Sequence, residues 1–182
     1  TRAPAAVAAA VENGRVAGVR LTTGETIRCG KVINAAGAWA RDVGALAGVP
    51  VPLQAVEHMY VVTEAIPGLE QPFPIVRDLD EGIYIKGDSG KLVLGGFEPD
   101  AKLFQTKSVQ GEQPFLELPD DWGQFEPFMT AGLALMPKLA DAGIRHFMNG
   151  PESFTPDTRP LMGESPYLRG FSDDFSIPVS RW

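Results

Sequence analysis

The stretch VINAAGAWAR, residues 32–41, most constrains the fold, because an apolar run ends abruptly in small residues before an alanine-rich segment. Apolar residues then recur at helical spacing over residues 38–47, and a glycine followed by two prolines ends the pattern. The sequence therefore predicts a buried strand over residues 31–35, a tight glycine turn and a helix. In such a unit the helix N–H groups can face an anion.

Two explanations account for the small residues that follow this strand. They allow the strand and the helix to pack closely, or they allow a ligand to approach bare backbone, as nucleotides do beside the carboxyl ends of strands in open α/β sheets. The pattern G-x-G-x-x-G of dinucleotide sites does not precede the stretch. Taken alone, these residues favour close packing.

The composition excludes several classes of function. The chain has 182 residues and a formal charge of -7, with no block of basic residues, so we expect neither nucleic acid nor a membrane as a partner. One cysteine, Cys29, and two histidines, His58 and His146, form neither a disulfide framework nor a Cys/His metal cage. We therefore expect no metal and a cytoplasmic location.

Hydrophobic periodicity predicts strands over much of the chain. The alanine-rich residues 5–11 favour a helix that ends at Asn13-Gly14, and a hairpin centred on Thr23-Gly24 follows. Residues 54–65 alternate between apolar and polar as a strand does. The segments 74–79 and 82–97 predict three further strands of an antiparallel sheet, the last two joined by a turn at residues 87–90.

The second half is predicted to contain one long helix. Residues 123–143 show helical spacing despite two prolines. The predicted buried face of this helix consists of Phe125, Phe128, Met129, Leu133, Met136 and Leu139. Residues 99–120 predict a long irregular excursion, residues 144–155 a strand and residues 156–163 a loop.

Few residues carry evident chemistry. His58 lies in the middle of a predicted strand, where a hydrogen-bonded structural histidine is more common than a functional one. Tyr84 is also typical of strand packing. Arg77 and Arg159 could clamp a carboxylate through two parallel hydrogen bonds, although Arg77 can pair instead with the aspartates around it. Neither a Ser-His-Asp elbow nor paired carboxylates support a hydrolase.

Five stretches, in chain order, resemble the D-amino-acid-oxidase-type flavoproteins, and most closely the dimethylglycine and sarcosine dehydrogenase branch. They are VINAAGAWA, VEHMYVVTE, IVRDLDEGIYIK, LVLGGFEP and NGPESFTPDTRPLMG. The resemblance implies an α+β fold with a mainly antiparallel sheet and flanking helices. Its domains would be a partial FAD-binding domain (1–50), a substrate-binding domain (51–148), a return segment of the FAD-binding domain (149–171) and an atypical tail (172–182).

The resemblance also implies a site and a reaction. His58 and Tyr84 would be catalytic, and Tyr60, Arg77 and Arg159 would bind substrate. The residues implied to contact FAD are Ala36, Gly37, Trp39, Pro156, Asp157 and Gly163. The implied reaction is hydride transfer to FAD from an N-methylated amino acid of the sarcosine or dimethylglycine type, with a neutral histidine accepting the proton of the amine. The electron acceptor could be oxygen or an electron-transfer protein.

The glycine-rich N-terminal βαβ unit of that family has no counterpart in these residues. We therefore expect the chain to be a fragment of a flavoprotein that binds FAD weakly when it is alone. The alternative is a non-catalytic regulatory or binding module of the same family.

Overall fold

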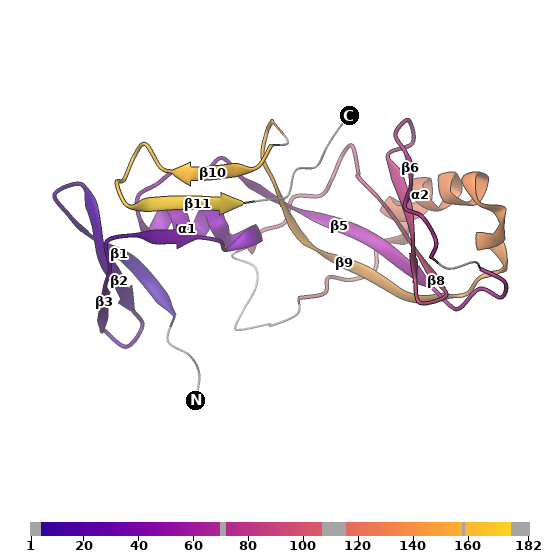
Figure 1. Ribbon diagram of the computed structural model, residues 1–182, viewed down its shortest axis with the longest axis horizontal. Coiled ribbons are helices and arrows are strands. Elements are labelled where there is room, and N and C mark those ends of the chain that lie inside the picture. The colour runs from indigo at the N-terminus through magenta and orange to yellow at the C-terminus, as the bar shows by residue number, and fades with distance from the viewer. Residues whose placement is uncertain (1–4, 70–71, 107–115, 158, 176–182) are drawn as a thin grey trace. The chain divides into compact units, whose positions relative to one another are not determined.

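The computed structural model describes residues 5–69, 72–106, 116–157 and 159–175 (Figure 1). It confirms the α+β class, because most strands are antiparallel and helices are few. The chain forms two compact units, which are described separately below. Among the described residues, unit 1 consists of residues 5–55, 105–106, 152–157 and 159–175, and unit 2 of residues 56–69, 72–104 and 116–151.

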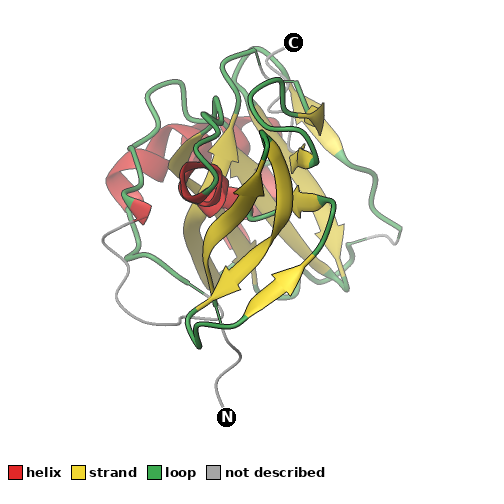
Figure 2. Cartoon of the chain, turned by 90° about the vertical axis from the view of Figure 1, so that its left-hand side faces the viewer, coloured by secondary structure: helices red, strands yellow, loops and turns green. Residues whose placement is uncertain are grey.

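Unit 1 begins with a three-stranded antiparallel sheet, which lies in front in Figure 2. Its strands are β1 (Ala6–Glu12), β2 (Arg15–Leu21) and β3 (Thr26–Arg28), in that order. The predicted helix over residues 5–11 is therefore wrong. Asn13 and Gly14 both have positive φ, 50° and 69°, and form the tight turn of a hairpin instead of a helix cap. Seven residues are too few for a stable isolated helix, so pairing with β2 overrides the alanine propensity.

The second hairpin of this sheet is confirmed. The turn between β2 and β3 is closed by hydrogen bonds from Leu21 N to Glu25 O and from Gly24 N to Leu21 O. Gly24 takes a φ of 85°, which a side chain would strain.

A second sheet of unit 1 joins distant parts of the chain in the order β10-β11-β4. Its strands are β4 (Val32–Asn34), β10 (Leu161–Glu164) and β11 (Phe171–Phe175), and β11 is parallel to β4. The predicted loop over residues 156–163 thus contains the start of β10, and the atypical tail predicted from residue 172 begins as a strand. β4 is confirmed as a strand, but it is covered on one face only, because the side chain of Ile33 is 68% exposed.

The predicted turn and helix follow β4 as η1 (Gly37–Trp39) and α1 (Ala40–Leu46). Close packing occurs within the helix, at Gly44, where an added Cβ would collide with the side chain of Val51. The core of unit 1 collects residues from both sheets and from the segment after α1. It consists of Val16, Ala40, Val49, Val51, Leu53, Leu168 and Phe171.

Unit 2 is built on a five-stranded sheet of order β6-β7-β8-β5-β9. Its strands are β5 (Gln54–Thr63), β6 (Val76–Asp78), β7 (Ile83–Asp88), β8 (Lys91–Gly96) and β9 (Ile144–Phe154). The pairs β6–β7, β7–β8 and β8–β5 are antiparallel, as the sequence predicted. The turn between β7 and β8 lies at residues 89 and 90, which have φ values of 50° and 81°.

Helix α2 (Trp122–Leu135) packs against β7 and β8, and the following 3-10 turn η3 (Pro137–Asp141) contacts α2 and adds Leu139 to the same core. Met136, which precedes a proline, adopts an extended conformation and ends the helix. The predicted buried face is confirmed, because all six residues belong to the core or pack against it. No helix in the described part of the chain is long and apolar enough to cross a membrane.

Candidate functional site

The two faces of the unit 2 sheet differ in character. Successive side chains of a strand point to opposite faces. Met59 and Val61 of β5 are buried in the core beside α2. His58 and Tyr60 of the same strand therefore lie on the opposite face.

Strand register adds two further predicted residues to that face. Tyr60 lies opposite Gly95, Tyr84 also lies opposite Gly95, and Arg77 lies opposite Tyr84. Residues that are directly paired across antiparallel strands share a face. The structure thus brings four of the predicted site residues together. We call the surface formed by His58, Tyr60, Arg77, Tyr84 and Phe97 the site face.

Phe97 is the member of the site face that the sequence analysis missed. Its ring stacks on the His58 ring at 5.1 Å with an interplanar angle of 17°. It also lies 6.1 Å from the Tyr84 ring and 5.8 Å from the guanidinium carbon of Arg77. A signal was present in the sequence, because residue 97 follows Gly95 by two positions and so points to the same face.

Glu98 is the second residue that was missed. Its Oε2 lies 3.3 Å from Nδ1 of His58, and the side chains of Glu98 and His58 are only 4% and 14% exposed. The other carboxylate oxygen, Oε1, is buried with no hydrogen-bond partner among the described residues. A carboxylate in such surroundings is costly to bury unless it is paired, so contact with the imidazole compensates for part of that cost.

Two adjacent glycines allow aromatic rings to lie flat on opposite faces of β8. A Cβ added at Gly95 would collide with the Tyr84 ring on the site face. A Cβ added at Gly96 would lie 2.6 Å from the ring of Phe128 on the core face. Gly95 therefore determines how closely the phenol of Tyr84 approaches the sheet.

The predicted cofactor residues after β4 lie in unit 1. Gly37 is exposed, has a φ of 53°, and would place an added Cβ within 4 Å of no other described atom. Ala36 packs against the unit 1 core, and Trp39 is 36% exposed. Close packing therefore does not require the glycine at position 37. The positive φ of Gly37 favours glycine whether or not a ligand lies beside it, so contact of this turn with FAD stays a prediction.

Gly163 belongs to the same unit. It pairs with Asp173 of β11, and Asp173 pairs with Asn34 at the end of β4. Asn34 donates from Nδ2 to Asp173 Oδ1 at 3.1 Å and to the Ala40 carbonyl at 2.9 Å. A polar layer therefore crosses this sheet next to the Ala36–Gly37 turn.

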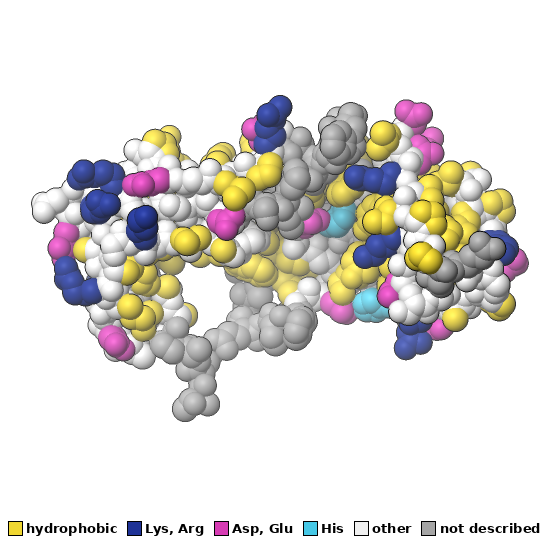
Figure 3. All heavy atoms as spheres, in the orientation of Figure 1, with side chains coloured by type: hydrophobic (Ala, Val, Ile, Leu, Met, Phe, Trp, Pro, Cys, Tyr) yellow, Lys and Arg dark blue, Asp and Glu magenta, His cyan; other side chains and the backbone are white. Residues whose placement is uncertain are grey.

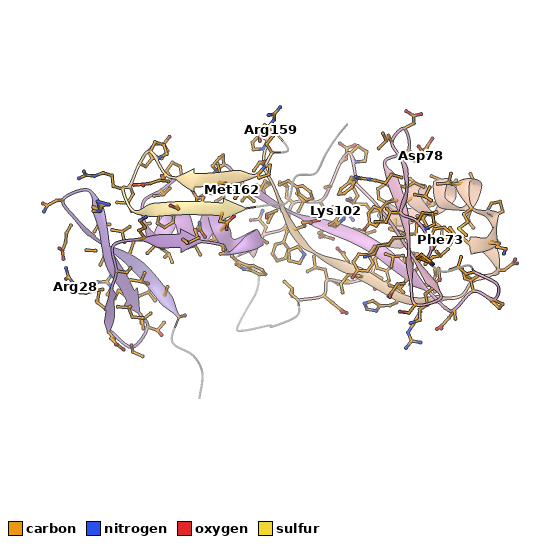
Figure 4. The ribbon with its side chains drawn as sticks, viewed as in Figure 1. Arg28, Phe73, Asp78, Lys102, Arg159 and Met162 are labelled. Carbon is orange, nitrogen blue, oxygen red and sulfur yellow. The ribbon has the colours of Figure 1, made fainter. Side chains whose placement is uncertain are left out.

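The turn between β9 and β10 holds the remaining predicted residues, and all of them are exposed. Asp157 accepts a hydrogen bond from Arg159 N at 3.2 Å. That bond lowers the pKa of the Asp157 carboxyl, and a hydrogen bond from the Thr155 hydroxyl lowers it further. Figure 4 shows Arg159 in this turn. Arg159 belongs to unit 1, so its role at the site face, like the cofactor roles of Pro156 and Asp157, stays a prediction.

Two hollows in the described residues are lined by other side chains. One, of about 540 Å³, is lined by Arg15, Arg28, Cys29 and Arg169 among others, and the second, of about 800 Å³, lies beside α2 and includes Asp78 and Glu126. Charged groups of both signs are interspersed over the face of the molecule that Figure 3 shows. Neither hollow contains the histidine or the tyrosines of the site face.

Comparison with known proteins gives the family. The family model of FAD-dependent oxidoreductases matches residues 2–175. The mitochondrial sarcosine dehydrogenase of Homo sapiens is 43% identical over 157 residues, which cover 86% of this chain and 17% of that protein. The mitochondrial pyruvate dehydrogenase phosphatase regulatory subunit of Mus musculus is 36% identical over 164 residues, covering 88% and 18%.

The fold is also that of a solved structure. L-proline dehydrogenase from P. horikoshii superimposes with a TM-score of 0.75 at 22% identity, covering 94% of this chain and 43% of that one. The chain spans less than a fifth of the length of the two curated relatives. The resemblance drawn from the sequence is confirmed: the chain belongs to the family of FAD-dependent oxidoreductases and is similar to its sarcosine and dimethylglycine dehydrogenase branch.

Proposed function

We propose that this chain takes part in the FAD-dependent oxidation of a secondary or tertiary N-methyl amino acid, of the sarcosine or dimethylglycine type. The main support is the site face, where an imidazole, two phenols and a guanidinium share one side of the unit 2 sheet. The match to sarcosine dehydrogenase supports the substrate class. In this proposal unit 2 contributes the substrate side and unit 1 part of the FAD-binding side.

The residues of unit 1 fit a flavin cofactor. The exposed backbone at Gly37, which lacks a neighbouring side chain within 4 Å of a built Cβ, would let a flat ligand approach closely. Ala36, Gly37 and Trp39 would hold FAD there, with Gly163, Pro156 and Asp157 on the return segment. When it is bound, FAD supplies the hydride acceptor.

His58 would prepare the substrate for oxidation. An N-methyl amine is mostly protonated near neutral pH, and its nitrogen must lose that proton before a hydride can leave the adjacent carbon. A neutral imidazole accepts such a proton effectively because its ordinary pKa of about 6.5 is close to the working pH. The amine N–H bond breaks, and the proton moves to the Nε2 atom of His58.

The other members of the site face would orient the substrate. A guanidinium can bind the substrate carboxylate through two parallel hydrogen bonds, which gives Arg77 its proposed role. The hydroxyls of Tyr60 and Tyr84 can donate to the same carboxylate or to the amine. Phe97 supplies an apolar wall, which strengthens these polar contacts by excluding water.

The decisive experiment uses the polypeptide that carries this sequence, expressed at its natural length and loaded with FAD. Anaerobic flavin bleaching is followed with sarcosine, dimethylglycine and glycine. We expect the two N-methylated amino acids to reduce the flavin. His58→Gln should slow that reduction by about 10²- to 10⁴-fold, the usual contribution of a general base. The matched control is His146→Gln, the other histidine of the chain, which should leave the rate unchanged.

A second function is favoured by one comparison. The match to a regulatory subunit of pyruvate dehydrogenase phosphatase suggests a non-catalytic module. Full FAD occupancy with no reduction by any of the three amines would support that role and rule out amine oxidation of this class. The same assay under air, with and without an artificial electron carrier, would separate oxygen from an electron-transfer protein as the acceptor.

A further inference from the structure

The contact between His58 and Glu98 has a chemical consequence. Nδ1 of His58 lies 3.3 Å from Oε2 of Glu98, and both side chains are largely buried. Neutral imidazole has one N–H donor and one acceptor nitrogen, whereas an ionised carboxylate can only accept. A hydrogen bond between the two therefore requires the proton of neutral His58 to be on Nδ1.

We propose that Glu98 is a positioning residue that holds His58 in the Nδ1–H tautomer and leaves Nε2 as the acceptor nitrogen. The tautomer is a property of the chain's own residues. Its use, acceptance of the amine proton at Nε2, rests on the function proposed above.

Three features of unit 2 support this assignment. Burial strengthens the hydrogen bond, because a carboxylate at 4% exposure has little water to replace the imidazole as its partner. Glu98 Oε1 has no hydrogen-bond partner among the described residues, so the contact through Oε2 matters more to this carboxylate. The stacked ring of Phe97 opposes the 180° rotation of the His58 ring that would place Cδ2 where Nδ1 faces Glu98.

One short segment both stacks a ring on His58 and places a carboxylate beside its Nδ1, because Phe97 and Glu98 are adjacent in the sequence. Phe97 and Glu98 follow the last residue of β8, and Phe97 N donates to the Gly82 carbonyl at 3.0 Å. This bond fixes the backbone where β8 ends. The ring that stacks on His58 and the carboxylate that bonds its Nδ1 are therefore delivered by neighbouring residues.

The tautomer can be measured directly by nitrogen NMR on protein labelled with ¹⁵N-histidine. The spectrum is simple, because the chain contains two histidines, and His146→Gln assigns them. At a pH about two units above the ordinary histidine pKa of about 6.5, we expect His58 to show a protonated Nδ1 and an unprotonated Nε2. His146 serves as an internal contrast, because its side chain is 42% exposed and should show the Nε2–H form that isolated imidazole prefers in water.

Two variants of Glu98 distinguish the effect of its hydrogen bond to His58 from the effect of its negative charge. Glu98→Gln retains an acceptor oxygen and can therefore retain the Nδ1–H tautomer. Glu98→Ala removes the acceptor and should move His58 to the Nε2–H form that isolated imidazole prefers in water. In the FAD-loaded protein, flavin reduction by sarcosine should fall by at least tenfold in Glu98→Ala and by less in Glu98→Gln.

The outcomes distinguish this proposal from the proposed function. An Nε2–H tautomer for His58 in the unmodified protein overturns the role of Glu98, whatever the enzyme does. The expected tautomer together with no flavin reduction by any amine leaves the role of Glu98 intact and removes the oxidation proposal. If Glu98→Ala fails to fold, the spectrum of the unmodified protein decides the question, because glutamine can also donate a hydrogen bond to Nδ1 and so permits either tautomer.

Discussion

Gly95 leaves the space on β8 that the ring of Tyr84 occupies. Gly95→Ala would push the Tyr84 ring off β8, because the new Cβ would occupy the space of that ring. We expect slower flavin reduction by sarcosine in the FAD-loaded protein, with a smaller loss of folding stability than Gly96→Ala causes. Gly96→Ala forces a methyl group into the ring of the buried Phe128 and should lower the free energy of unfolding by about 1–3 kcal/mol.

A double-mutant cycle tests the steric explanation. If the collision with the Tyr84 ring is the cause, the destabilisation by Gly95→Ala should disappear in a Tyr84→Ala background. Strict additivity of the two free-energy changes, measured by urea unfolding, would show that the ring of Tyr84 is not what the added methyl meets.

Asp173 provides a prediction about pH. Burial raises the pKa of its carboxyl above the ordinary value, and the hydrogen bond from Asn34 opposes this in part. The folded state therefore holds the proton more tightly than the unfolded state, so this group stabilises the fold at low pH, and that stability is lost as the pH rises through the folded pKa. Asp173→Asn should raise the free energy of unfolding at neutral pH, because it removes the buried charge and keeps an oxygen for Asn34 Nδ2.

The neighbouring aspartate is the matched control for this substitution. Asp174 is exposed on the other face of β11, so Asp174→Asn should change the free energy of unfolding little. Equal effects of the two substitutions in urea titrations at pH 7 would contradict the burial argument.

The candidate site could be predicted in part from single residues. His58, Tyr60, Tyr84 and Arg77 were selected by residue type and resemblance, and the structure places all four on one face. Glu98 was not selected, because nothing in its local sequence shows that its carboxylate meets an imidazole 40 positions away.

Strand β1 is an element whose type the sequence predicted wrongly. Its alanine-rich sequence favours a helix, but the two-residue turn after it returns the chain at once, so β1 and β2 form their backbone hydrogen bonds with each other. By contrast, β5 was predicted correctly, and α2 was predicted with the right buried face although it ends at Leu135 and not at residue 143. Each of these elements is long and periodic, and each buries one face in the same core.

The stability of helix α2 depends in part on Asp121, the N-cap residue that precedes its first turn. Asp121 Oδ1 accepts from Gln124 N at 3.1 Å, and its other carboxylate oxygen pairs with Lys102. The Lys102 hydrogen bond, followed by the Gln124 N–H, lowers the pKa of the Asp121 carboxyl. Asp121→Ala should therefore lower the free energy of unfolding by about 1 kcal/mol, the usual value of a helix cap.

Asp121→Asn is the informative comparison for α2, because an amide oxygen can still cap the helix. It should be less destabilising than Asp121→Ala. The contribution of the Asp121 charge is present above the unfolded pKa and is lost as the pH falls through the lowered folded pKa. The difference between Asp121→Asn and the unmodified protein should thus vanish in acid, and a difference that persists there would exclude the charge as its source.

The two units have separate hydrophobic cores. The buried residues of the unit 2 core lie between Met59 and Phe147, and those of the unit 1 core lie outside that range. We therefore expect residues 54–154, which contain all five strands of the unit 2 sheet and α2, to fold without the rest of the chain.

Thermal unfolding of this excised segment, followed by circular dichroism, should show one cooperative transition. Leu94→Ala, at a fully buried position, should destabilise the segment by about 2–5 kcal/mol. A broad, non-cooperative melt that Leu94→Ala leaves unchanged would show that the unit 2 core is insufficient alone.

The sequence alone determined which residues of α2 face a core and that β5 alternates between two faces, because helical spacing and alternation are patterns among neighbouring positions. It also determined the family, through short stretches that resemble those of the family and follow the same order along this chain. Tertiary structure decided the rest: that an alanine-rich segment is a strand, that the polar residues 172–174 continue one, and that Phe97 and Glu98 surround His58. These outcomes depend on which strands pair and in what register, and pairing joins residues whose separation along the chain leaves no local signal.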